Sequence, residues 1–118
     1  MLAENEIQVD QEVTPENVTE VIQNQIKDNE LLVYVKGNSL MPQCGFSGQI
    51  IEILRRVGVP FKTFDILSNM EIREGVKRFS NWPTLPQLYF QQKFIGGCDI
   101  VTQMYQNGEL DSLLKKEG

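Results

Sequence analysis

The stretch Leu31–Val57, LLVYVKGNSLMPQCGFSGQIIEILRRV, decides the fold. Its first five residues form a short apolar run rich in β-favouring residues, which is typical of a buried strand. From Ile50 to its end, isoleucine, leucine and valine recur at helical spacing, and Gly58 and Pro60 then provide a stop. The connecting loop ends at Cys44. The stretch therefore predicts a strand, a loop and a helix, with a cysteine at the start of the helix.

The rest of the chain supplies elements that complete one sheet. A β-α-β connection is right-handed, and a following hairpin extends its sheet to four strands. We therefore predict a thioredoxin-like α/β fold, a four-stranded mixed sheet flanked by helices, with an extra N-terminal helix. The further elements expected are a helix capped by Thr14, a strand over 61–66, a helix begun by a capping box at Ser68, two strands joined by Gln91-Gln92, a helix capped by Asp99, and a last helix over 109–116.

Composition and charge narrow the classes of function. The 118 residues suit one domain, and no apolar run approaches the roughly 18 residues of a membrane span. The net charge is −5, and residues 1–30 hold eight acids and one base. We expect a flexible acidic lead-in over residues 1–13 and one domain over 14–118. The chain lacks the basic footprint of a nucleic-acid-binding protein, and we expect neither nucleic acid nor membrane as a partner.

The cysteine and histidine counts restrict the chemistry. Cys44 and Cys98 are far apart in the sequence and do not make a disulfide scaffold. We expect a reducing intracellular compartment: the cytoplasm, or the mitochondrial matrix or a plastid if the chain is a processed form. The sequence contains no histidine, which excludes Cys-His and Ser-His catalysis and histidine-ligated metal sites.

Cys44 is the candidate reactive residue. Unpaired N–H groups at a helix N-terminus favour the thiolate, and Lys36 can add positive charge if the loop folds back. The alternative is a small buried hydrophobe, as free cysteines often are. The position between a strand and a helix favours the reactive thiol.

Several separated motifs carry a resemblance to a known family. CGFS at 44–47, the upstream Lys36-Gly37, NWPTLPQLYF at 81–90 and FIGGCDI at 94–100 occur in this order. From about residue 14 to 114 the chain resembles the monothiol glutaredoxins of the CGFS class. The resemblance implies a glutathione site with Cys44 as the thiolate. It also implies that Pro86 is cis.

The resemblance assigns each end of glutathione to particular residues. Its glycine carboxylate would be held by Lys36 and Arg73, with help from Lys77 or Gln43. The backbone of Leu85 would pair with the tripeptide, and Cys98 and Asp99 would bind the γ-glutamyl end. Without the resemblance, the favoured interpretation of Lys36, Arg73 and Lys77 is that they are solvated surface charges, and Asp99 could be only a helix cap.

One thiol per site leaves two functions open. Ser47 occupies the position of the second cysteine in a C-x-x-C motif, so the dithiol redox route is closed. A [2Fe–2S] cluster takes four thiolates, which two Cys44 thiolates and two glutathione molecules supply in a cluster-bridged homodimer. The resemblance implies such a cluster carrier, with BolA-like and iron–sulfur acceptor proteins as partners. The alternative is a glutathione-dependent thiol–disulfide oxidoreductase; an interaction domain alone leaves the charged set unexplained.

Overall fold

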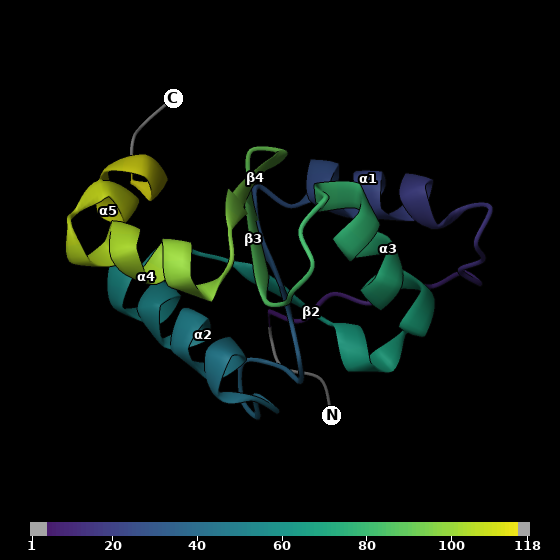
Figure 1. Ribbon diagram of the computed structural model, residues 1–118, viewed down its shortest axis with the longest axis horizontal. Coiled ribbons are helices and arrows are strands. Elements are labelled where there is room, and N and C mark those ends of the chain that lie inside the picture. Colours follow the sequence, from purple (N-terminus) through teal and green to yellow (C-terminus); the bar gives the residue numbers. More distant parts are fainter. Residues whose placement is uncertain (1–4, 116–118) are drawn as a thin grey trace.

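A mixed sheet lies at the centre of the computed structural model, which describes residues 5–115 (Figure 1). β1 (Leu31–Val35) pairs parallel with β2 (Lys62–Asp65) and antiparallel with β3 (Gln87–Phe90). β3 pairs antiparallel with β4 (Lys93–Gly96), which gives the order β2-β1-β3-β4. The predicted thioredoxin-like arrangement of the sheet is confirmed.

Helices cover both faces of this sheet (Figure 1). α1 (Val18–Asp28) and α3 (Met70–Ser80) lie on one face. α2 (Gly45–Val57) and α4 (Cys98–Gln106) lie on the other, and α5 (Glu109–Leu114) follows α4. No helix among the described residues is long and apolar enough to cross a membrane.

β1 shows how the sequence builds two cores. All five of its residues are buried, because both faces of the central strand are covered. Successive side chains of a strand point to opposite faces. Leu31, Val33 and Val35 accordingly pack with α2 and α4, whereas Leu32 and Tyr34 pack with α1 and α3.

The predicted start of α1 is wrong by three residues, and that of α3 is wrong by one. α1 begins at Val18 rather than directly after Thr14, although the Val18 N–H already donates to the Thr14 carbonyl. α3 is capped by Asn69, because Ser68 still belongs to the short 3-10 turn η1 (Ile66–Ser68). At the other end of the chain, the predicted end of the last helix at Lys116 lies outside the described residues.

The described part of the N-terminal segment contacts the edge of the sheet. The Ile7 N–H donates to the Thr63 carbonyl of β2 at 2.8 Å, and the Thr63 N–H donates to the Asn5 carbonyl at 2.9 Å. Ile7, Val9 and Val13 are partly buried against the core under α1 and α3. The division of the chain at residue 14 and the flexibility of residues 1–13 stay predictions.

Candidate functional site

Cys44 occupies the N-cap position of α2. Its backbone is extended, with φ −152° and ψ 157°, and helical geometry begins at the next residue. The Ser47 N–H donates to the Cys44 sulfur at 3.4 Å, as an N-cap side chain normally accepts from the first turn of its helix. The residue is half-buried, and its thiol is free.

The surroundings of Cys44 favour its thiolate. Partial burial raises the pKa of the thiol. Hydrogen bonds from the Ser47 hydroxyl and from the N–H groups of Ser47 and Phe46 lower the pKa, and so does the charge of Lys36. The lowering effects prevail, so the pKa of Cys44 lies below its ordinary value. The predicted electrostatic effect of Lys36 is present.

Ser47 contacts the thiol in a way that the sequence analysis does not predict. In the sequence its position indicates only that a second thiol is missing. Its side chain is fully buried, with Oγ 3.3 Å from the Cys44 sulfur, and Oγ also accepts the Lys36 N–H at 3.0 Å. One hydroxyl thus links the end of β1 to the thiol. A serine three residues after a helix-capping residue is the available sequence signal, because that spacing places it opposite the cap.

The loop over residues 36–43 is folded tightly against the sheet. Gly37 has φ +89°, and a Cβ there would lie 2.5 Å from the Met41 carbonyl oxygen, so glycine is required. The Gly37 N–H donates to Asp65 at the end of β2, and the Gln43 N–H donates to the Lys36 carbonyl at 2.8 Å. The Gln43 amide group donates back to Met41, and Gln43 is not among the residues that line the neighbouring cavity.

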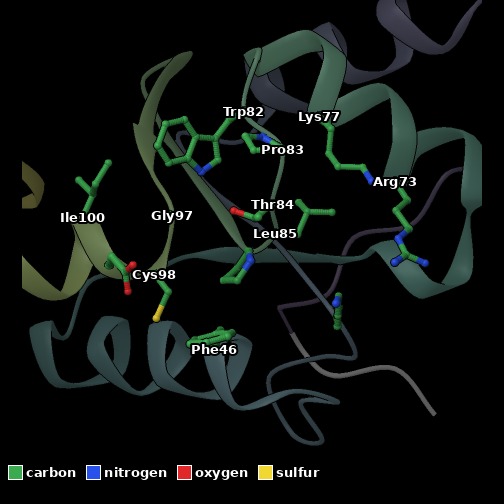
Figure 2. Close-up of a pocket in the computed structure, with 13 residues that line it drawn as sticks. Phe46, Arg73, Lys77, Trp82, Pro83, Thr84, Leu85, Gly97, Cys98 and Ile100 are labelled. Carbon is green, nitrogen blue, oxygen red and sulfur yellow. The ribbon is translucent and has the colours of Figure 1, made fainter.

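A cavity of about 460 Å³ is lined in part by Phe46, two residues after Cys44 (Figure 2). Its walls come from the N-terminal turns of α2 and α4, from α3 and from the loop between α3 and β3. Five of the six residues predicted for the site line it: Lys36, Arg73, Leu85, Cys98 and Asp99. Cys44 is not a lining residue, but its charge influences the pKa of Cys98.

The two ends of the cavity differ in character. Figure 2 shows Arg73 and Lys77 of α3 on one side and Cys98 of α4 on the other, with Leu85 between them. Lys77 Nζ lies 3.0 Å from a carboxylate oxygen of Glu74, and Arg73 Nε lies 4.0 Å from the same oxygen. The cavity therefore offers cations at one end and the start of α4 at the other.

The loop before β3 supplies exposed backbone to the cavity. The Leu85–Pro86 peptide bond is cis, which confirms that expectation. Among residues 5–115, no group accepts a hydrogen bond from the Leu85 N–H. An extended ligand could use this free donor as a neighbouring strand would.

The start of α4 differs from the prediction in one respect. Gly97 is the N-cap residue, and Asp99 lies in the first turn instead of capping the helix. A Cβ on Gly97 would lie 3.3 Å from the Pro86 carbonyl oxygen, so the chain approaches the loop closely there. Burial raises the pKa of the Cys98 thiol, which makes Cys98 the less reactive of the two cysteines.

Comparisons with known proteins identify relatives of this chain. The Glutaredoxin family model matches residues 31–95. An uncharacterized monothiol glutaredoxin, ycf64-like, from Synechocystis sp. is 52% identical over 87 residues, which cover 74% of this chain and 81% of that protein.

Solved structures extend the comparison to three dimensions. The solution structure of reduced poplar apo GrxS14 has a TM-score of 0.74 at 37% identity, over 84% of this chain and 91% of that one. The crystal structure of a buckwheat glutaredoxin–glutathione complex has a TM-score of 0.76 over 86% and 91% of the two chains. At 21% identity, this second match shows the fold alone. The chain thus belongs to the glutaredoxin family, with the monothiol glutaredoxins as its near relatives.

Proposed function

We propose that this glutaredoxin carries [2Fe–2S] clusters and passes them to acceptor proteins. The observation that carries the proposal is the state of Cys44: a half-exposed thiol with a lowered pKa, at a helix N-terminus, with Ser47 in place of a second thiol. A thiolate is the form of cysteine that binds a metal. Such a site suits a cluster that the protein carries and passes on. Each chain contributes only one thiolate, Cys44, and a thiolate of an acceptor protein can replace it.

Glutathione is the ligand that best fits the cavity. Glutathione is an extended anion whose ends carry a glycine carboxylate and a γ-glutamyl group with an ammonium. In this proposal Lys36 and Arg73 hold the carboxylate, the free Leu85 N–H pairs with the backbone, and Cys98 and Asp99 bind the γ-glutamyl end. The distribution of charge along the cavity supports this direction of binding.

The number of thiolates supports a dimer bridged by the cluster. A [2Fe–2S] cluster usually takes four thiolates. The chain has two cysteines, and burial raises the pKa of Cys98, which disfavours its thiolate. Two chains with one glutathione each supply the four from Cys44 and glutathione alone. BolA-like proteins and iron–sulfur acceptor proteins are the partners we propose, on the family resemblance.

The second candidate function is a glutathione-dependent thiol–disulfide oxidoreductase. The lowered pKa of Cys44 favours it too, because the thiolate is also the form that attacks a disulfide. After that attack, Ser47 cannot resolve the mixed disulfide. A second glutathione would have to do so, and this step would limit turnover.

Reconstitution without oxygen separates the two functions. The protein is incubated with iron, sulfide and glutathione, and its visible absorption and native mass are recorded. We expect sulfur-to-iron bands and a dimer that holds two glutathione molecules. Colourless protein with rapid turnover of a glutathione mixed disulfide would favour the oxidoreductase instead.

Two matched variants test the ligand assignment. Cys44→Ser should abolish cluster binding, whereas Cys98→Ser should keep most of it. A full cluster formed with a glutathione analogue that lacks the thiol would mean that both cysteines are ligands, and would overturn the assignment.

A further inference from the structure

Gln87 is a buried polar residue directly behind the cavity. It is the first residue of β3 and is fully buried. Its Nε2 donates to the carbonyl oxygens of Thr84 at 3.1 Å and Trp82 at 3.3 Å, and its Oε1 accepts the Tyr89 hydroxyl at 3.0 Å. The side-chain amide therefore uses both donors and its acceptor within the protein.

The orientation of this amide is determined by its neighbours. Two carbonyl oxygens can only accept, so the nitrogen of the amide must face them. Burial raises the pKa of Tyr89 to about 12, so its hydroxyl keeps its proton and can donate to Oε1. Tyr89 and the two carbonyls thus select one orientation of the Gln87 side chain.

The loop that Gln87 contacts has few other supports. Trp82 is tied at its N–H to the end of α3, where it donates to the Lys77 carbonyl at 3.1 Å. Beyond it, Pro83 and Pro86 have no N–H to donate, and the Leu85 N–H has no partner among the described residues. The residues over 82–86 all line the cavity. The Trp82 N–H also lies 3.1 Å from Ser80 Oγ, to which it donates, whereas the Trp82 and Thr84 carbonyl oxygens accept their hydrogen bonds from Gln87.

We infer that Gln87 is a positioning residue for glutathione binding. Its side-chain amide holds the Trp82–Leu85 segment by the carbonyl oxygens of Trp82 and Thr84, and this leaves the Leu85 N–H free for the ligand. The inference rests on the proposed function, because it concerns the ligand proposed for that cavity. Gln87 itself lies outside the cavity lining and acts through the loop. A preorganised loop binds more tightly than one that must be ordered by its ligand.

A structural role alone makes a different prediction. Gln25 provides the comparison, because it is buried on α1, outside the cavity lining, and accepts the Tyr34 hydroxyl at 2.7 Å, while its Nε2 donates to no described residue. If Gln87 serves only stability, changing it should lower the melting temperature and leave glutathione affinity unchanged, as a change of Gln25 should leave it. A positioning role predicts a loss of affinity for Gln87 variants only.

The experiment is a titration of the folded protein with reduced glutathione, followed by NMR chemical shifts. We expect Gln87→Met to weaken binding by roughly tenfold, the value of one hydrogen bond of ordinary strength, and Gln25→Met to leave it within twofold of wild type. Tyr89→Phe is the milder variant if Gln87→Met does not fold. It should weaken binding severalfold, whereas Tyr34→Phe should not.

Gln87→Glu adds a readout that a stability role would not move. At neutral pH a carboxylate would face two carbonyl oxygens without a donor, so binding should weaken more than in Gln87→Met. At lower pH the protonated acid can donate to one carbonyl, and affinity relative to wild type at the same pH should recover in part. The Met variant should show no such recovery.

The outcomes separate this inference from the proposed function. If wild type binds no glutathione, both are overturned. If wild type binds it and the Gln87 and Tyr89 variants bind equally well, only the positioning role is wrong. Equal losses in the Gln25 and Gln87 variants would also overturn that role, since they would reflect stability alone.

Discussion

Removing the Ser47 hydroxyl is the most direct test of how the thiolate is stabilised. In Ser47→Ala the sulfur loses a hydroxyl at 3.3 Å but keeps the backbone N–H groups and the charge of Lys36. A hydrogen bond to a charged group contributes about 1.5–3 kcal/mol, and the length of this one favours the lower end. The thiolate should therefore be less stable by about 1.5 kcal/mol, which lowers its fraction roughly tenfold at any pH below the pKa.

The assay must measure ionisation and not reactivity alone. A thiol with a higher pKa gives a more nucleophilic thiolate, so the alkylation rate should fall only about threefold near neutral pH. The pH dependence of thiolate ultraviolet absorbance reports the ionisation itself and should show a raised pKa in Ser47→Ala. Ser47→Thr retains a hydroxyl and should recover part of the change.

Ser47→Ala also has a structural effect that needs a control. The part-buried Lys36 N–H loses its acceptor, and the free energy of unfolding should fall by about 1 kcal/mol. Gly48→Ala is the matched control, because its new Cβ would make only ordinary contact with Pro42, at 3.5 Å. If Ser47→Ala and Gly48→Ala both titrate like wild type, the hydroxyl does not stabilise the thiolate and our reasoning is wrong.

Three further predictions test the site and the fold. Arg73→Ala should shorten the half-life of the reconstituted cluster by roughly tenfold, and added glutathione should restore it in part. The control Lys115→Ala should leave the half-life unchanged. Equal half-lives in both variants would contradict the proposal that Arg73 holds the glycine carboxylate of glutathione. Limited alkylation near neutral pH, read by mass spectrometry, should label Cys44 before Cys98, because burial raises the pKa of Cys98; equal labelling is expected only after unfolding. Gln91 and Gln92 both have positive φ (50° and 70°), which Asn and Gly adopt more readily than Gln. Changing this turn to Asn-Gly should therefore raise the free energy of unfolding by about 1 kcal/mol. An unchanged midpoint of chemical denaturation would contradict this prediction.

Local signals in the sequence predicted most of the fold. The apolar run of β1, the helical spacing after Cys44 and the short strands around Gln91-Gln92 each lie within one segment, and each was found where expected. Helix starts were less accurate, because several side chains near a helix N-terminus can act as the cap. For α3 the sequence offered both Ser68 and Asn69, and the preceding 3-10 turn decides for Asn69.

Contacts between distant segments could not be predicted in the same way. The pairing of Ile7 with Thr63 joins two segments that share no motif. The link from Ser47 to Lys36 and the bonds from Gln87 to its loop depend on how the chain returns to the site. The resemblance to a family predicts which residues line the cavity, but it does not predict the hydrogen bonds of Ser47 and Gln87.

The N-terminal contact with β2 covers a strand edge at which two molecules could otherwise pair. Strand edges with unpaired backbone groups invite pairing between molecules. Residues 5–7 occupy the outer edge of β2 at Thr63, whereas none of the described residues bonds to the outer edge of β4. That second edge is only four residues long, begins with Lys93 and adjoins a register shift in β3, all of which discourage pairing. A chain that lacks the first seven residues would therefore expose unpaired backbone groups at the outer edge of β2. We expect self-association of such a fragment to begin at that edge.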